Sequence, residues 1–155
     1  MPIQHIVLFD GNERNNLLPL TATRAVADIR VGILTIREKW EKHLNVKVDI
    51  LTQEYLQEKY TYEPTENTVF INASVLPDKD LISATEQLSH NGILESGKTI
   101  VAVKTNETIT SLQELKLAVQ KTDSINRPFS NSIINFPWDI FTLNGQEIRN
   151  DIQLL

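Results

Sequence analysis

The chain has 155 residues, of which 41% are hydrophobic, and this is enough for one domain with a substantial core. Its net charge of -5 and pI near 5.2 argue against duplex nucleic acid as a partner, because neutralising phosphates requires a concentrated basic surface. The absence of cysteine excludes disulfides and thiolate metal sites.

A short apolar run, HIVLF at residues 5–9, begins the pattern and ends at Asp10-Gly11. A compact apolar run followed by a turn is typical of a buried strand. The run lacks the basic flank and the length of a signal peptide, and no other stretch reaches membrane-spanning length. We therefore expect a cytoplasmic protein that does not contact a membrane.

The segment beyond this turn is predicted to form a long helix. Apolar residues recur there at steps of three and four, so that they share one helix face: Val26, Ile29, Ile33, Ile36, Trp40 and Leu44. Asn45 is a suitable stop. The spacing therefore predicts a helix over residues 26–44.

Strands and helices alternate along the middle of the chain. Strand-like runs occupy residues 46–51, 68–73 and 99–104, and helical spacing occupies residues 78–88 and 111–121. The second of these helices begins with a capping box formed by Ser111 and Glu114. This alternation predicts an α/β fold, with a mostly parallel, Rossmann-like sheet between two helical layers.

Ligands of such sheets bind beyond the carboxyl ends of the strands. This rule puts Asp10-Gly11, Gln53 and residues 72–80 on one candidate binding rim. Arg14 follows the turn, as either a phosphate ligand or a solvated turn residue. Asp10 is either a ligand-facing carboxylate or a turn former before Gly11. Asn72 either recognises a base or sugar edge or caps the end of its strand.

Arg24 and Arg30 flank the start of the predicted long helix, where a cation opposes the helix dipole. Either an anionic ligand or a carboxylate partner would explain these arginines. Asp28 is the alternative partner for Arg24, because it lies four residues further along the helix.

The tail is predicted to pack aromatic residues around Pro137 and to begin a short amphipathic helix at Gly145 or Gln146. Trp138 and Asp139 are interpreted as a packed aromatic anchor and a turn carboxylate rather than as catalytic residues. Because the chain finishes on apolar residues without a helix stop signal, we expect it to be the amino-terminal part of a longer protein.

Several motifs together resemble a known family. They are LFDG at 8–11, Arg14, LLPLT at 17–21, residues 23–44, FINASVLPD at 70–78 and PWDIF at 137–141. With them, the chain resembles the sugar nucleotidyltransferases, and more narrowly the amino-terminal domain of the GlmU-like members, in which a left-handed β-helix follows. The resemblance implies a nucleotide-diphospho-sugar transferase-like fold. It also implies transfer from an NTP to a sugar 1-phosphate, with UTP and N-acetylglucosamine 1-phosphate as the suggested pair.

The family pattern also implies roles for particular residues. Arg14 and Arg24 would stabilise phosphate charge during catalysis. Nucleotide binding falls to four residues of the first loop: Asp10, Gly11, Asn12 and Thr21. Asn72 would bind the sugar. Asp78 would bind the implied cofactor, Mg²⁺, which prefers carboxylate and phosphate oxygens. The implied protein partner is the β-helix domain.

Three features depart from the family pattern. The first loop keeps only Gly11 of the usual glycines, no lysine occurs between Met1 and Ile36, and Asn72 stands where a metal-binding aspartate is common. An arginine can hold phosphate bidentately, so Arg24 can take the place of the lysine. Together the losses favour a second hypothesis, a catalytically degenerate nucleotide-binding or assembly domain of a β-helix protein.

Overall fold

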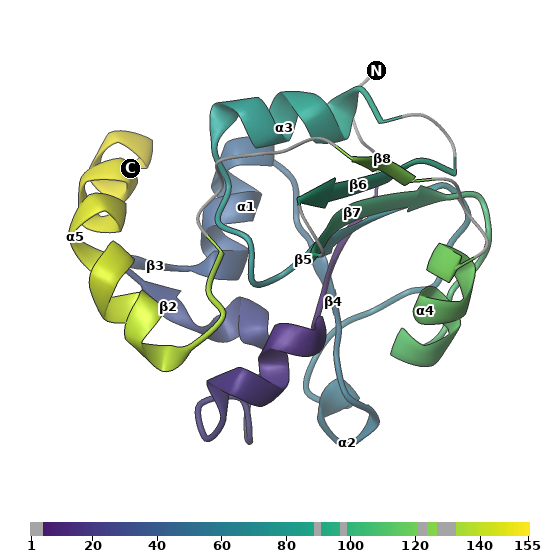
Figure 1. Cartoon of the computed structure of the whole chain (residues 1–155), viewed down its shortest axis with the longest axis horizontal. Helices are drawn as coiled ribbons and strands as arrows, with labels where there is room; N and C mark the ends of the chain where they lie inside the picture. The colour runs from purple at the N-terminus through teal and green to yellow at the C-terminus, as the bar shows by residue number, and fades with distance from the viewer. Residues whose placement is uncertain (1–4, 89–90, 97–98, 121–123, 127–132) are drawn as a thin grey trace.

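The computed structural model describes residues 5–88, 91–96, 99–120, 124–126 and 133–155, and it arranges them around one central sheet (Figure 1). The strands of this sheet are β1 (Ile6–Phe9), β4 (Asp49–Leu51), β5 (Thr68–Asn72), β6 (Ile93–Ser96), β7 (Thr99–Thr105) and β8 (Ser124–Asn126). Their order is β4-β1-β5-β7-β6-β8.

The sheet is mixed but mostly parallel. β1 pairs in parallel with β4 and β5, and β6 pairs in parallel with β8, whereas β7 is antiparallel to both of its neighbours. The sequence predicts β1, β4, β5 and β7, whereas β6 and β8 were not predicted. Because β6 and β7 pair antiparallel, β7 runs opposite to the other strands of the sheet.

Alternate residues of the strands feed two separate cores. Leu8 and Ile71 pack on one face with residues of α1 (Ile36–Leu44) and α3 (Lys79–Glu86). On the other face, Phe9 and Phe70 pack with residues of α4 (Leu112–Gln120). The period of two along buried strands thus produces helices on both sides of the sheet. The predicted three-layer α/β fold is confirmed.

The prediction of one helix over residues 26–44 is wrong in its first half. This half forms a 3-10 turn, η2 (Val26–Asp28), and a small hairpin of β2 (Arg30–Val31) and β3 (Leu34–Thr35). Gly32 turns the hairpin with φ of 76°, a conformation that residues with a side chain rarely adopt. Thr35 then begins α1 through a capping box with Glu38. The sequence contains this start signal, but the prediction followed the apolar spacing instead.

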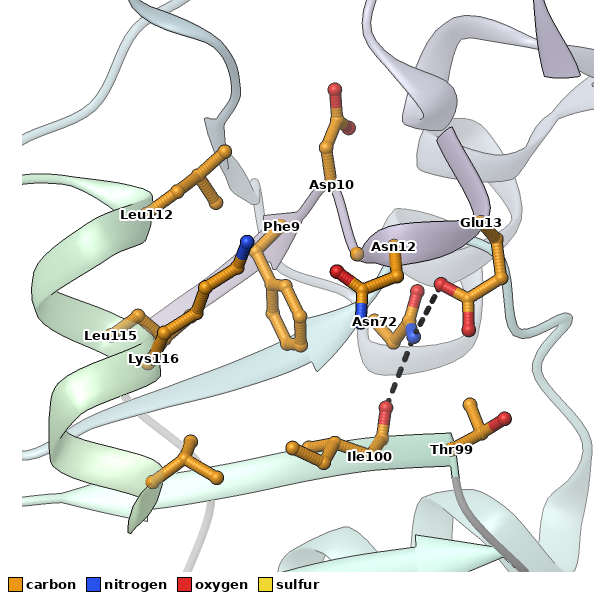
Figure 2. Close-up of a pocket in the computed structure, with 12 residues that line it drawn as sticks. Phe9, Asp10, Asn12, Glu13, Asn72, Thr99, Ile100, Leu112, Leu115 and Lys116 are labelled. Atoms are coloured by element: carbon orange, nitrogen blue, oxygen red, sulfur yellow. Dashed lines mark hydrogen bonds between the residues drawn. The ribbon is translucent and has the colours of Figure 1, made fainter. Parts of the chain in front are cut away.

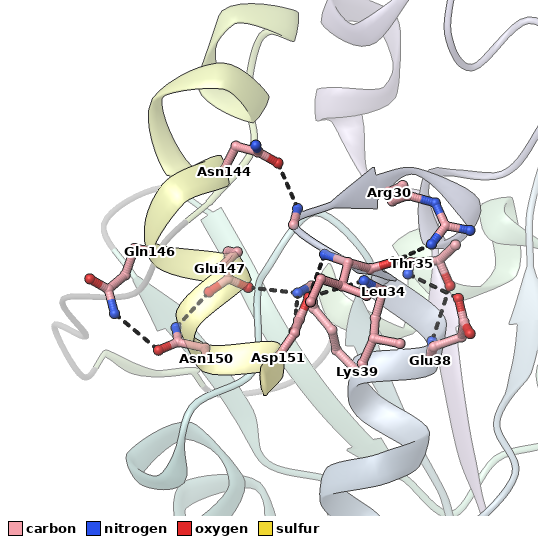
Figure 3. A network of polar contacts seen from close by, with 12 residues as sticks. Arg30, Leu34, Thr35, Glu38, Lys39, Asn144, Gln146, Glu147, Asn150 and Asp151 are labelled. Carbon is pink, nitrogen blue, oxygen red and sulfur yellow. Dashed lines mark hydrogen bonds and ion pairs between the residues drawn. The ribbon is translucent and has the colours of Figure 1, made fainter. Parts of the chain in front are cut away.

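Tertiary contacts with the last helix, α5 (Pro137–Leu154), explain why the hairpin replaces helix (Figure 3). The Asp151 Oδ2 atom accepts hydrogen bonds from the backbone N–H groups of Ile33 at 2.8 Å and Leu34 at 3.0 Å. The Asn144 Oδ1 atom accepts from the N–H group of Gly32 at 2.9 Å. Side chains more than a hundred residues away therefore satisfy the backbone of this turn.

A buried lysine of α1 joins the same contact. The Lys39 Nζ atom lies 2.5 Å from Asp151 Oδ1 and 3.1 Å from Glu147 Oε1, and all three side chains are buried. Figure 3 shows this network between α1 and α5. We call Lys39, Glu147 and Asp151 the Lys39 cluster.

The tail also differs from the prediction. Its helix begins at Pro137 rather than at Gly145 or Gln146, because proline suits the first helical position and Asp139 accepts from the backbone N–H of Phe136 at 3.0 Å. Trp138 is not a buried anchor: it is 61% exposed and stacks on Phe136, with ring centroids 4.6 Å apart.

Other helix boundaries agree more closely with the sequence. Asn45 ends α1 in the left-handed conformation, with φ of 54°. The predicted helices over 78–88 and 111–121 are α3 and α4, although Lys121 lies outside the described residues. The 3-10 helix η1 (Asn12–Leu17) and the short helix α2 (Glu54–Gln57) were also not predicted. Among the helices described, none is both long and apolar enough to cross a membrane.

Candidate functional site

Three neighbouring cavities lie at the carboxyl ends of β1, β4 and β5. The Asn72 cavity is bordered by Phe9, Gly11, Asn12, Asn72, Ile100 and Lys116, among others (Figure 2). The Arg14 cavity adjoins it, sharing Gly11, Asn12 and Lys116, and adds Arg14, Gln53 and Gln113. The Gln57 cavity shares Gln53 and Gln113 and adds Gln57, Thr110 and Ser111. Because they share lining residues, the three cavities adjoin one another at the predicted rim, and together we call them the crevice.

Asp10 connects the elements at the start of this crevice. Its Oδ1 atom accepts from the Val26 N–H at 3.0 Å, and its Oδ2 atom accepts from the Thr52 hydroxyl at 2.6 Å. Figure 2 shows the carboxylate pointing away from Asn12 and Asn72. Burial raises the pKa of Asp10 to about 6, although these hydrogen bonds and Arg14 act in the opposite direction.

The Arg14 guanidinium is buried and largely occupied by protein groups. Its Nη2 atom donates to the Thr21 carbonyl oxygen at 2.9 Å and to the Tyr55 hydroxyl. Its Nε atom lies 3.6 Å from Asp10 Oδ2 and forms no hydrogen bond with any described residue. Arg14 thus combines a structural role with a position on the wall of the Arg14 cavity.

Thr21 does not border any of the three cavities; its hydroxyl is buried and donates to the Arg14 carbonyl oxygen at 2.9 Å. The structure therefore gives Thr21 a position beside Arg14, behind the crevice wall. Its predicted contact with a nucleotide stays a prediction.

Arg24 is exposed in the loop before η2 and is not among the residues that border the three cavities. Its predicted pair with Asp28 is wrong, because Asp28 instead lies 3.2 Å from Arg37 Nη2 and accepts from the Tyr60 hydroxyl at 2.7 Å. The reason is the absence of helix here, which removes the four-residue spacing on a common face. Arg30 is an exposed residue of β2 whose guanidinium donates to the Ile33 carbonyl oxygen.

Gly11 permits two side chains to meet in the Asn72 cavity. A Cβ atom at position 11 would lie 2.5 Å from Glu13 Oε2 and 2.9 Å from Asn72 Nδ2. The Asn72 amide donates to that Glu13 oxygen at 3.3 Å and to the Ile100 carbonyl oxygen at 3.0 Å, and its own oxygen accepts from the Ser74 N–H. Asn72 therefore caps its strand end and also borders the cavity, whereas its contact with a base or sugar stays a prediction.

Asn12 and Lys116 face each other across the crevice. Asn12 is exposed at the start of η1, where the backbone N–H groups of the first turn have no acceptor within the helix. Lys116 extends from α4 toward the end of β1 (Figure 2). Lys116 and Glu13 were not among the site residues predicted from the sequence. Glu13 follows Gly11 closely enough to be noticed, whereas no local signal shows that α4 packs beside β1.

The residues described around the crevice do not fit a Mg²⁺ site made by protein carboxylates. Asp78 caps α3 by accepting from the Leu81 N–H at 2.7 Å and does not border the three cavities. Both oxygens of Asp10 accept hydrogen bonds already, and Glu13 stands beside an amide rather than a second carboxylate. Within the described part of the chain, no three histidine, aspartate or glutamate side chains group as metal ligands.

The family model described as sugar nucleotidyl transferase matches residues 6–155. The chain belongs to this family. A crystal structure from Bacillus anthracis, described as a glucose-1-phosphate thymidylyltransferase in complex with a sucrose, has a similar fold. The superposition has a TM-score of 0.51 at 7% sequence identity and covers 93% of this chain and 95% of the other. No curated protein matches the sequence. At 7% identity the structural match supports the fold alone, whereas the family match rests on the sequence and gives the family.

Proposed function

We propose that this domain is a cytoplasmic, GlmU-like enzyme that joins an NTP and a sugar 1-phosphate into an NDP-sugar and pyrophosphate. The main support is a crevice of three adjoining cavities, lined by both polar and apolar residues, at the carboxyl ends of the parallel strands, in a chain whose sequence matches a sugar nucleotidyl transferase family. UTP and N-acetylglucosamine 1-phosphate are the first pair to test.

The three cavities suggest an order for the parts of the substrates. Gln53 and Gln113 offer amide groups for a base edge where the Gln57 and Arg14 cavities meet. Gly11 and Asn12 offer backbone N–H groups for phosphate beside them. Asn72 and Glu13, which border the Asn72 cavity, offer hydrogen-bonding groups for a sugar.

In this arrangement, a sugar phosphate oxygen attacks the α-phosphorus as the bond from that phosphorus to the pyrophosphate oxygen breaks. The protein contributes by holding the two substrates in line and by stabilising the charge of the departing pyrophosphate. The reaction requires no covalent bond to the chain.

A second candidate is a domain that binds a nucleotide or assembles with a β-helix domain but does not catalyse transfer. The Arg14 guanidinium favours this candidate, because Asp10, Thr21 and Tyr55 occupy it and hold it in the wall of the crevice. For this second candidate, a nucleotide binds in the crevice, but the protein releases no pyrophosphate.

Pyrophosphate release by the purified protein separates the two candidates. We would screen NTP and sugar 1-phosphate pairs in magnesium-containing buffer and measure NTP binding by calorimetry on the same preparation. Release that depends on both substrates supports the enzyme. NTP binding without release supports the second candidate, and absence of both contradicts any nucleotide function of the crevice.

Two arginine variants sharpen this result. If Arg24 contacts phosphate, as the family pattern implies, Arg24→Ala lowers turnover while leaving the unfolding midpoint unchanged, because Arg24 is exposed. Arg14→Ala is expected to lower both turnover and stability, since the guanidinium is buried and bonded. Full activity of Arg24→Ala would remove that residue from the mechanism.

A further inference from the structure

Lys116 borders two of the three cavities of the crevice. It is shared by the Asn72 cavity and the Arg14 cavity, together with Gly11 and Asn12. Its ammonium group extends from α4 toward the end of β1 (Figure 2). A cation in this position faces both the backbone at the start of η1 and the space beside Asn72.

Unlike Arg14, Lys116 makes no side-chain contact with another described residue that would compete with a ligand. Among the residues described around the three cavities, the cations are Arg14 and Lys116. Arg14 is buried and bonded to Thr21 and Tyr55. Lys116 is exposed, and no other described residue forms a hydrogen bond or ion pair with its side chain. Its three N–H donors remain available for an anion.

The position of Lys116 is fixed by α4 rather than by the first loop. Leu115 and Ala118 of the same helix are buried in the core that contains Phe9 at the end of β1. At the start of α4, the Ser111 hydroxyl accepts from the Glu114 N–H at 3.2 Å, and Glu114 accepts from the Thr110 N–H at 2.8 Å. A packed and capped helix therefore presents the lysine to the crevice from the side opposite η1.

We propose that Lys116 is a phosphate-contacting residue of this site: an ammonium group carried by α4 binds the phosphate chain of the NTP, in a protein whose first loop has no lysine. This inference rests on the proposed function for the identity of the ligand. A compact, mobile ammonium suits a phosphate chain because it can follow the charge as the pyrophosphate departs.

Calorimetric binding of NTP and of inorganic tripolyphosphate tests the inference with Lys116→Ala, Lys116→Arg and Lys42→Ala. Lys42 is the matched control, an exposed lysine on α1 that borders none of the three cavities. We expect Lys116→Ala to weaken both ligands by about ten- to a hundredfold, as for the loss of a charged hydrogen bond. The weakened binding should also respond less to salt, whereas Lys116→Arg retains part of the affinity and Lys42→Ala retains all of it.

Circular dichroism and urea unfolding of each variant ensure that a folded protein is compared. Unchanged affinity in folded Lys116→Ala overturns the inference and leaves the proposed reaction intact. Weaker binding by Lys116→Ala, together with a wild-type protein that binds NTP without releasing pyrophosphate, supports the inference and contradicts the proposed reaction. A wild-type protein that binds neither NTP nor tripolyphosphate contradicts both.

Discussion

Among the residues that the structure describes, two cations are buried, Lys39 and Arg14, and their surroundings differ. Lys39 lies within 3.1 Å of carboxylate oxygens from both Glu147 and Asp151, and it borders none of the three cavities. Arg14 faces the single carboxylate of Asp10 at 3.6 Å and has an Nε atom without a hydrogen bond to any described residue.

This difference separates a charge cluster that fixes the fold from one that borders a candidate site. In the Lys39 cluster, each charge has a close partner, and Asp151 in addition satisfies the backbone of the hairpin. Around Arg14 and Asp10 the pairing is incomplete, and burial raises the pKa of Asp10 to about 6. Arg14 and Asp10 thus form a less tightly paired cluster, and both residues border the Arg14 cavity.

The largest predicted effect comes from removing the cation of the complete cluster. Lys39→Met leaves the buried Glu147 and Asp151 carboxylates without a cation, and we expect the free energy of unfolding to fall by about 3–5 kcal/mol. Urea unfolding measures this loss. The control is Arg37→Met, which removes a partly exposed pair with Asp28 and should cost less than about 1 kcal/mol. Equal losses for the two variants would contradict the distinction.

Gly32→Ala tests how tightly the hairpin and α5 are packed. The new Cβ atom would lie 2.8 Å from Asp151 Oδ2 and 2.8 Å from the backbone carbon of Glu147, at a φ of 76°. Steric strain and overpacking together predict a loss of about 2–4 kcal/mol in urea unfolding. Gly145→Ala is the matched control, because no atom lies within 4 Å of its Cβ position, and it should stabilise the helix by about 0.5–1 kcal/mol.

Asp10→Asn tests the incomplete cluster through pH. A carboxyl whose pKa is raised on folding favours the folded state most when it is protonated. The wild-type free energy of unfolding should therefore fall as the pH rises from about 4 to about 6, with Asp10 contributing about 2–3 kcal/mol to that fall. The variant lacks this contribution, while the exposed Asp80→Asn keeps it. Parallel stability curves for Asp10→Asn and the wild type over this range would refute the assignment.

The smallest effect on stability is predicted for Gly11→Ala. Its backbone, with φ of -85° and ψ of -168°, accepts any residue, and the new Cβ atom meets the far ends of two side chains rather than backbone. Because Asn72 is buried and hydrogen-bonded, moving it should lower the free energy of unfolding by about 1–2 kcal/mol. Displacement of Glu13 and Asn72 should nevertheless lower the affinity for a sugar 1-phosphate about tenfold, measured by calorimetry. Wild-type affinity in this variant would exclude the pair from the ligand contact.

The fold was predictable where local pattern and tertiary packing agree. The run at residues 5–9 and the strand ending at Asn72 are apolar and buried, and their periodicity gave the layers of the sheet. The hairpin at Gly32 was not predictable from the same rules, because its apolar residues have helical spacing. Acceptors on α5, more than a hundred residues away, decide that segment.

The location of the candidate site was predictable from the sequence, but the orientations of its side chains were not. The strand-end rule correctly brought Gly11, Gln53 and Asn72 to one crevice. It could not show that the Arg14 guanidinium turns toward the Thr21 carbonyl oxygen, since loop sequence does not fix a long side chain. Lys116 is separated from the first loop by a hundred residues, and only the packing of α4 brings it to that loop.

The orientation of α5 determines how the free energy of detaching this helix should depend on temperature. Apart from Ile140 and Leu143, which pack against the core, this helix directs Asn144, Glu147 and Asp151 inward and leaves Trp138, Phe141 and Ile152 in water. Detaching it from the hairpin would hydrate polar groups, which lowers the heat capacity, alongside few apolar ones, which raise it. The free energy of detaching α5 should therefore depend almost linearly on temperature. The free energy of unfolding the sheet core should instead show the curved temperature dependence of hydrophobic unfolding.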